Sequence, residues 1–312
     1  MRHLVTGARG FIGAATVRLA LEAGDAVAVL VRPGSAPGRL QAVAADVTWI
    51  EGDLTALDEP DVRRACAAFA PDTVIHAGWA GVAGSERNDD MQVHHNVAAA
   101  LELTVLAGEC GARHIIGLGS QAEYGPCAGR VSEAQALNPT TMYGAAKIAA
   151  AAVTRTKAAL LRMQHSWLRV FSTYGPGSDP RWLLPMAAAA MARGMAPALT
   201  RCEQRWEFLH VDDAARAVLA VAQHGAVGAC NLGSGDARVL SDVIAALRDR
   251  IEPSLQPSFG ALSYRPDQIM WLEADITRLH HATGWLPCVS LDTGLDELAA
   301  EALGRRGVTA DV

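Results

Sequence analysis

The chain has 312 residues, half of them hydrophobic, and this length is enough for one large domain or two smaller ones. Its formal net charge is −6 and its basic residues are scattered, so we expect neither a nucleic-acid partner nor a membrane partner. The six cysteines are widely spaced without a Cys-x-x-Cys pair, which argues against a metal site or a disulfide framework and indicates a cytoplasmic location.

The start of the chain predicts a strand, a helix and a second strand. A β-rich segment at 3–5 leads into a glycine-rich turn, and residues 11–23 have the periodicity of a helix. Residues 26–31 follow as a buried strand that ends before a Pro-Gly pair. The opening letters MRHLVTGARG have the pattern of a strand and a turn, not of a secretion signal. This order is typical of a parallel α/β sheet.

The same alternation continues to about residue 172. Further strands are predicted at 47–50, 73–76, 114–118 and 167–171. Helices are predicted between them at 60–69, 91–110 and 141–163. Prolines then become frequent, and loops separate helical segments near 183–193, 212–223, 240–250 and 291–303.

This organisation predicts an α/β fold with two unequal domains. The first is a Rossmann-type, doubly wound parallel sheet, formed by residues 1–172 with a returning segment at about 205–235. The second is a smaller, C-terminal substrate-binding domain formed by residues 173–204 and 236–312.

The segment TGARGFIG spaces Gly7, Gly10 and Gly13 evenly between a predicted strand and a predicted helix. Glycine at these positions allows a tight turn, lets the backbone approach a pyrophosphate and lets the helix pack close to the sheet. Three glycines also occur in ordinary turns, but this placement favours dinucleotide binding.

The residue after the second predicted strand bears on the choice of cofactor. Arg32 stands where a carboxylate for the adenosine ribose is expected, and an arginine there can pair with a 2′-phosphate. NADP(H) is therefore favoured and NAD(H) is possible, unless Arg32 is only a solvated loop cation. Arg9 in the glycine loop can assist. Asp53, after the third strand, can meet the adenine edge or close a turn.

Ser120, Tyr143 and Lys147 follow in the order of a hydride-transfer site. Tyr143 and Lys147 are four residues apart, so they share one face of a predicted helix. Reduction of a carbonyl needs a proton at the oxygen, and lowering a tyrosine pKa by about 3 units takes about 4 kcal/mol. A lysine ammonium one turn away and an oxidised nicotinamide can supply that stabilisation, while Ser120 orients the substrate oxygen.

Together these motifs resemble the extended short-chain dehydrogenases/reductases of the nucleotide-sugar epimerase/dehydratase group. The resemblance covers nearly the whole chain through TGARGFIG, GDLT, PDTVIHAG, HNV, GSQAEYG, YGAAK, LRVFSTYGPG, WEFLHVDDAARA and NLGSG. It identifies Ser120, Tyr143 and Lys147 with the family's catalytic triad. With the glycine loop included, the predicted cofactor-binding residues are Gly7, Arg9, Gly10, Phe11, Ile12, Gly13, Arg32, Asp53, Leu54, His76, Ala77, Gly78, Asn96, Tyr143, Lys147 and Phe171.

The resemblance also implies a nucleotide-diphosphate sugar as the substrate. The predicted substrate-binding residues are Gln121, Ser172, Arg205 and Arg265. Arg265 stands where the family places a pyrophosphate-binding arginine, although it can also be a surface arginine. The letters WEF depart from the family's Arg-Asp-Phe. It is therefore open which residue of this segment touches the substrate. The alanine-rich helices at 91–110 and 141–163 resemble those that pair in the family's homodimers, but they also suit packing on a sheet.

Three reactions compete within this group. Related dehydratases carry Asp-Glu where this chain has Gln121 and Ala122, and neither of these is a general base. Glu123 comes one residue later and would face away on a strand. Arg32 and the letters GSQAEYG favour NAD(P)H-dependent reduction of a nucleotide-linked 4-keto-6-deoxyhexose over NAD-dependent epimerisation. A non-enzymatic nucleotide-sensing protein is a distant alternative, since such proteins usually lose the tyrosine or the lysine.

Overall fold

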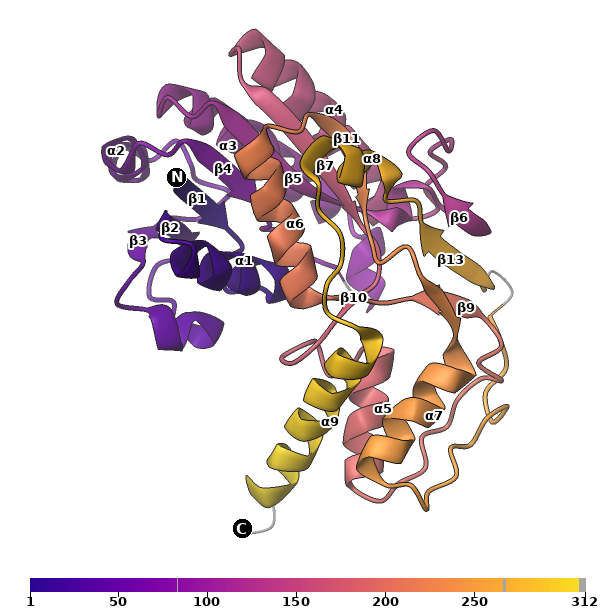
Figure 1. Ribbon diagram of the computed structural model, residues 1–312. Helices are drawn as coiled ribbons and strands as arrows, with labels where there is room; N and C mark the ends of the chain where they lie inside the picture. The colour runs from indigo at the N-terminus through magenta and orange to yellow at the C-terminus, as the bar shows by residue number, and fades with distance from the viewer. Residues whose placement is uncertain (83, 266–267, 309–312) are drawn as a thin grey trace.

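Seven parallel strands form the large sheet of the computed structural model, which describes residues 1–82, 84–265 and 268–308 (Figure 1). Their order is β11-β7-β5-β4-β1-β2-β3. The bounds are β1 (Arg2–Thr6), β2 (Ala26–Val31), β3 (Thr48–Glu51), β4 (Thr73–His76), β5 (His114–Ser120), β7 (Gln164–Val170) and β11 (Gly228–Leu232). The order reverses between β1 and β4, and ligands of such sheets bind beyond the carboxyl ends of the strands at this point. The predicted α/β Rossmann sheet is confirmed.

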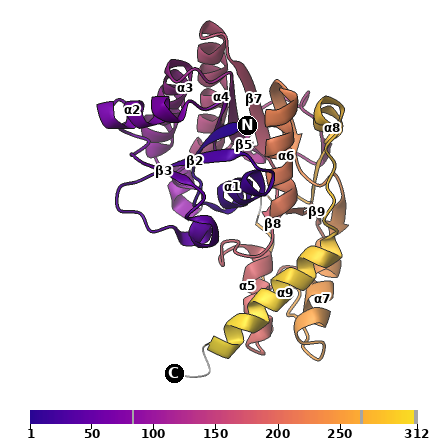
Figure 2. The same cartoon turned by 60° about the vertical axis from the view of Figure 1, so that its left-hand side comes forward.

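Helices cover both faces of this sheet (Figures 1 and 2). One face carries α1 (Phe11–Glu22) and α6 (Val211–His224), and the other carries α2 (Pro60–Phe69), α3 (Ala98–Glu109) and α4 (Met142–Leu160). Successive side chains of a strand point to opposite faces. Val5 of β1 therefore packs in the core beneath α1 and α6, and its neighbour Leu4 packs in the core beneath α2 and α3.

The helix predicted at 91–110 has an irregular start. It begins as a π-helical segment, η3 (Gln92–Val97), and continues as α3. Gln92 and Asn96 are buried in this segment and face the loop that follows β4. Gln92 Nε2 donates to Gly81 O at 2.6 Å, and the Asn96 amide bonds Ala80 N and Ala80 O at 3.0 Å each. The two amides therefore fasten this loop beside the carboxyl end of the sheet.

The second structural unit is a mixed sheet with three helices of its own. The strand order β12-β9-β13-β6 joins β6 (Gly129–Val131), β9 (Arg205–Glu207), β12 (Ala237–Val239) and β13 (Trp271–Ala274). A short pair, β8 (Thr173–Tyr174) and β10 (Leu209–His210), connects it to the large sheet. The helices α5 (Leu183–Ala192), α7 (Leu240–Ile251) and α9 (Leu291–Val308) lie side by side at one end of the molecule around a separate core (Figure 1).

The two sheets do not follow the predicted domain boundaries. β6 comes from residues assigned to the first domain, and β9 from the segment expected to return to it, yet both pair in the small sheet. Conversely, α8 (Thr277–Thr283) packs against α6 and β11 of the large unit. The division into two domains stays a prediction, as does the homodimer. Within the described residues, no helix is both long and apolar enough to cross a membrane.

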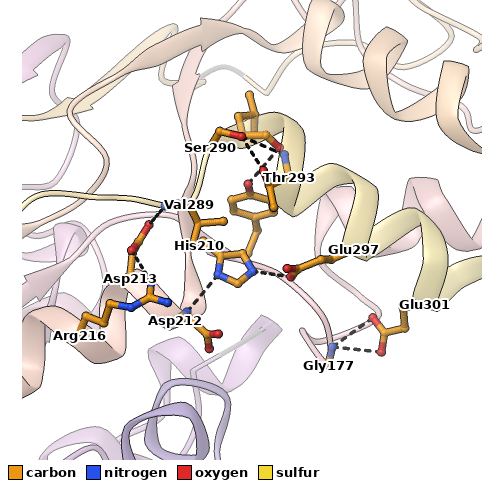
Figure 3. Close-up of polar contacts among 12 residues, drawn as sticks. Gly177, His210, Asp212, Asp213, Arg216, Val289, Ser290, Thr293, Glu297 and Glu301 are labelled. Atoms are coloured by element: carbon orange, nitrogen blue, oxygen red, sulfur yellow. Dashed lines mark hydrogen bonds and ion pairs between the residues drawn. The ribbon is translucent and has the colours of Figure 1, made fainter. Parts of the chain in front are cut away.

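Two buried side chains fasten the C-terminal segment to the rest of the protein (Figure 3). The Asp213 carboxylate of α6 accepts from Cys288 N at 3.1 Å and from Val289 N at 2.8 Å, and it pairs with Arg216 at 2.7 Å. His210 Nδ1 accepts a hydrogen bond from Asp212 N at 3.2 Å. The ring proton is therefore on Nε2, which donates to Glu297 of α9 at 3.0 Å.

Replacing Asp213 with alanine is expected to lower the free energy of unfolding by about 2 kcal/mol, because two backbone N–H groups lose their acceptor. Urea denaturation measures this change. The matched control is Asp61→Ala on α2, where both partners of an ion pair with Arg64 are exposed and the expected change is within about 0.5 kcal/mol. Equal losses in the two variants would contradict the role assigned to Asp213.

Candidate active site

The glycine loop has a backbone shape that fits a dinucleotide pyrophosphate. Gly7 has a φ of +66°, and a Cβ there would overlap the backbone of Ala77 after β4. A Cβ at Gly13 would overlap the carbonyl of Gly7. The helix α1 begins after Gly10, and no side chain caps its first N–H groups. These donors at a helix N-terminus form an anion-binding site at the switch point of the sheet.

Two arginines lie at the predicted adenosine end of this site. Arg32 is exposed directly after β2. Arg9 lies against Gly38, with its Nε 3.6 Å from the position of a Cβ there, and this Nε is buried without a hydrogen-bond partner. Arg39 donates to the backbone oxygen of Arg9 at 3.2 Å. An unpaired buried guanidinium donor fits a further anionic group of the cofactor.

Asp53 and Leu54 have local roles in the structure. Asp53 Oδ1 accepts from Thr55 N at 2.8 Å and from Thr55 Oγ1 at 2.7 Å. These bonds, with a smaller contribution from Arg32, hold the pKa of Asp53 below its usual range. This is the turn that the sequence left open as an alternative. Leu54 packs against Gly78, where a Cβ would lie 2.7 Å from Leu54 Cδ1.

The predicted cofactor-binding residues at the end of β4 are His76, Ala77 and Gly78. His76 Nδ1 is hydrogen-bonded to Thr6 Oγ1 at 2.8 Å, and burial, with the charge of Lys147, lowers the pKa of His76 to about 3. The imidazole is therefore neutral. Ala77 lines the cavity described below, whereas Asn96 is absent from the lining because its amide is used by Ala80. The structure thus shows Asn96 as a loop anchor, and its contact with the cofactor stays a prediction.

The three predicted catalytic residues meet in one cavity. Ser120 ends β5 and caps the 3₁₀ turn η4 (Gln121–Glu123), where its Oγ accepts a backbone N–H at 3.1 Å. Tyr143 and Lys147 lie one turn apart near the start of α4. All three line the cavity, and Ser120 is close enough to Tyr143 to lower the pKa of its hydroxyl.

Lys147 is a buried cation with few polar contacts. Its Nζ donates to Leu118 O at 2.6 Å and lies 3.5 Å from the ring centroid of Trp79. Burial lowers the pKa of Lys147 to about 7, which the charge of Glu123 partly opposes. The aromatic face of Trp79 supports the ammonium by a cation–π contact.

The pKa of Tyr143 is shifted in the direction opposite to the expected one. Burial raises its pKa, while the hydrogen bond from Ser120 and the charge of Arg87 act in the opposite direction. Lys147 is farther from the tyrosine, with Nζ 5.7 Å from the ring centroid, and points to Leu118 and Trp79. The predicted lowering of the Tyr143 pKa by its helical neighbour is therefore not seen, since the ammonium is directed elsewhere.

Glu123 lies behind the catalytic serine in a buried ion pair. Its carboxylate accepts from Ser120 N at 2.9 Å, from Trp167 Nε1 at 2.8 Å and from Arg169 Nε at 2.8 Å. The sequence argument placed Glu123 on a strand facing away. The structure corrects this, because β5 ends at Ser120 and the next residues form a 3₁₀ turn that points the carboxylate inward.

The cavity has a volume of about 750 Å³ and extends from the catalytic residues towards the small sheet. Of the predicted residues, those that line it are Ile12, Ala77, Ser120, Gln121, Tyr143, Lys147, Phe171, Ser172 and Arg265. Phe11 lies beside it, with its ring edge-on to the lining residue Trp182 at 5.9 Å between centroids.

Arg205 is not among the residues that line the cavity, and its substrate contact stays a prediction. It donates to Ala237 O at 2.9 Å and lies 5.6 Å from the ring centroid of Trp271. Its neighbour Trp206 lines the cavity and donates to Ser172 Oγ at 2.6 Å. Adjacent residues of a strand point to opposite faces, so only one of the two faces this cavity.

Several lining residues had no useful signal in the sequence. Trp79 and Arg87 come from the irregular segment after β4, where no periodicity predicts the direction of a side chain. Gln204 and Arg181 come from loops for the same reason. Among the described residues, no cluster of three or more His, Cys, Asp or Glu side chains has the arrangement of a metal site.

A phosphate loop at the switch point of a parallel sheet, with Ser120, Tyr143 and Lys147 in one adjoining cavity, defines a Rossmann-fold enzyme of the short-chain dehydrogenase/reductase type. The sequence profile of the NAD dependent epimerase/dehydratase family matches residues 3–233, and the chain belongs to this family.

Known proteins agree with this assignment. The UDP-glucose 4-epimerase of Mycolicibacterium smegmatis is 27% identical over 306 residues, which are 95% of this chain and 96% of that protein. The dTDP-L-rhamnose 4-epimerase of Burkholderia thailandensis is 26% identical, covering 95% and 93%. The structure of the UDP-glucose 4-epimerase of Thermotoga maritima with UDP-glucose matches the fold with a TM-score of 0.85 at 24% identity, covering 99% and 100%.

Replacing Lys147 with methionine is expected to stabilise the protein more at about pH 6.5 than at about pH 9. The pKa of Lys147 is about 7 when folded and 10.5 when unfolded, so between these values the unfolded chain binds more protons and wild-type stability rises with pH. The variant lacks this pH dependence. Its gain in free energy of unfolding over the wild type therefore falls by about 2 kcal/mol between about pH 6.5 and about pH 9.

Urea denaturation at the two pH values measures this difference. The matched control is Lys157→Met, which replaces the half-buried lysine of the last turn of the same helix. A gain for Lys147→Met that is equal at both pH values would contradict the burial of a charged ammonium.

Proposed function

We propose that this protein reduces the keto group of a nucleotide-linked 4-keto-6-deoxyhexose with NADPH. The observation that carries the proposal is the lining of the cavity, which places Ser120, Tyr143 and Lys147 in one wall. The described lining residues also include the cations Arg87, Arg181 and Arg265 but no carboxylate. Arg181 is neutralised by the adjacent Asp179, and the other cations leave the cavity positive. Such a lining attracts a nucleoside diphosphate.

The chain's own groups have distinct roles in the proposed reaction. The bound nicotinamide supplies the hydride. Ser120 hydrogen-bonds the sugar carbonyl oxygen and orients it, and Tyr143 gives its proton to that oxygen. Lys147 has one donor bound to Leu118 O and further donors available for the nicotinamide ribose. Trp206 and Phe171 form apolar walls that exclude water from the carbonyl.

The cofactor assignment rests on the residues beside the glycine loop. Arg32 replaces the carboxylate that would repel a 2′-phosphate, and Arg9 offers a buried, unpaired Nε. NADPH is also the exchangeable reductant that a reductase needs. NAD(H) is the alternative.

A nucleotide-sugar 4-epimerase is the second candidate, favoured by the activities named for the relatives above. Epimerisation uses the same three residues but keeps the cofactor bound and returns hydride to the other face of the sugar. A 4,6-dehydratase is disfavoured, because Gln121 and Ala122 cannot act as bases and the Glu123 carboxylate is held by Arg169 and Trp167.

The discriminating experiment mixes the purified protein with NADPH and a panel of nucleotide-linked 4-keto-6-deoxyhexoses and follows the absorbance of the reduced nicotinamide. We expect NADPH oxidation, and a loss of about 10²-fold or more in kcat for Tyr143→Phe. Interconversion of nucleotide hexose epimers without net NADPH oxidation would support the epimerase instead. Full activity of Tyr143→Phe would contradict both.

Replacing Arg32 with glutamate is expected to weaken NADPH binding about tenfold or more and to leave NADH binding nearly unchanged, because only NADPH carries the 2′-phosphate. Nucleotide fluorescence titration measures both affinities without a substrate. The matched control is Arg64→Glu, which makes the same charge change on the exposed side of α2. Equal weakening of both cofactors by Arg32→Glu would contradict the assignment.

A further inference from the structure

Arg87 places a guanidinium directly over the catalytic tyrosine. Its Cζ lies 4.9 Å from the ring centroid of Tyr143, and the side chain lines the same cavity. Its Nε is buried without a hydrogen-bond partner. A cation at this distance over an aromatic face is held by the ring quadrupole. Arg87 is therefore part of the cavity wall, and so far only its charge has entered the argument.

The residues on either side of Arg87 are fastened in place. Gln92 Nε2 donates to the backbone oxygen of Glu86 at 3.0 Å, and Asn88 Oδ1 accepts from Met142 N at 3.2 Å. The second bond joins η2 (Gly84–Asn88) to the first residue of α4, next to Tyr143. Two anchors that flank Arg87 thus fix its backbone relative to the tyrosine.

Several charged groups surround Tyr143, and Arg87 is the one that stays positive and faces its ring. Ser120, at the end of β5, lowers the pKa of Tyr143, and the anion of Glu123 behind it raises that pKa. On α4, Lys147 points to Leu118 O, and its own pKa is about 7. Arg87 acts in the opposite direction to Glu123. An arginine also stays charged over the whole working range of pH, which a buried lysine does not.

We propose that Arg87 is a positioning residue that acts through Tyr143, as the fixed positive charge that stabilises the phenolate while the hydroxyl exchanges its proton with the substrate oxygen. This rests on the proposed hydride transfer at Tyr143. It divides the work expected of one lysine between two cations. Lys147 is free to hold the cofactor ribose, and Arg87 supports the tyrosine from η2.

The first test follows tyrosine ionisation and needs no sugar substrate. The chain has four tyrosines, and subtracting the pH titration of Tyr143→Phe from that of the wild type isolates the tyrosinate absorbance of Tyr143. With saturating oxidised cofactor, we expect Tyr143 to ionise below about pH 10. Arg87→Met should move this ionisation upward by about one pH unit, and Arg87→Lys should retain most of the wild-type behaviour.

Two controls separate this effect from general causes. Arg113→Gln removes one positive charge at the opposite end of β5 from Ser120, where the Arg113 side chain is 79% exposed and paired with Asp72. We expect no shift of Tyr143 in that variant. Thermal unfolding of Arg87→Met shows whether the fold is retained. An unmoved Tyr143 titration in folded Arg87→Met, or no Tyr143 ionisation below pH 10 in the wild type, overturns the proposal.

The second test uses turnover. In the oxidative direction Tyr143 must accept a proton, so the rising limb of kcat against pH should move upward in Arg87→Met by the same amount as the titration. A raised KM with an unmoved pH profile would mean that Arg87 only holds substrate, which overturns the proposal. If no nucleotide sugar is turned over, the proposed function fails, and the ionisation of Tyr143 still decides the role of Arg87.

Discussion

The buried ion pair between Glu123 and Arg169 is the interaction on which the geometry of the site depends. Glu123 holds the backbone of Ser120 on one side and Arg169 of β7 on the other. Arg169 donates to the Tyr124 hydroxyl at 2.9 Å, and that hydroxyl donates to Asn231 of β11 at 2.6 Å. The turn after β5 is thus joined to β7 and β11, the next two strands towards that edge of the sheet.

The same network continues into the small sheet and fixes the cavity from both sides. Asn231 Nδ2 donates to Val131 O of β6 at 2.8 Å, and Asn231 N donates to Glu133 at 2.7 Å. A buried pair is costly to break because the remaining charge is left unpaired, so its partners stay in register. Gly119 of β5 leaves room for it, since a Cβ there would lie 2.5 Å from Glu123 Oε1. The carboxylate that holds this frame is not available as an acid or a base.

The sequence predicted the parts of the site that rest on backbone periodicity. The spacing of the glycines between a strand and a helix located the Gly7 loop. The four-residue separation of Tyr143 and Lys147 placed both on one face of a helix. The sequence did not predict the direction of Lys147, because the carbonyl of Leu118 comes from β5 and the ring of Trp79 from the loop after β4. It also did not predict that Trp206 and not Arg205 lines the cavity, since the choice between two adjacent strand residues depends on which face meets the cavity.

Some donors at the candidate site find no acceptor in the protein itself. The ammonium of Lys147 is buried, and the Nε atoms of Arg9 and Arg87 lie in the interior without acceptors. Each unpaired donor costs folding free energy that an anionic ligand can return. A ligand that pairs with them binds only the folded chain, so affinity and stability are linked through the same atoms. Under the proposed function, the charge that weakens the empty fold is the charge that selects the nucleotide-linked substrate, which is the usual exchange of stability for function at an active site.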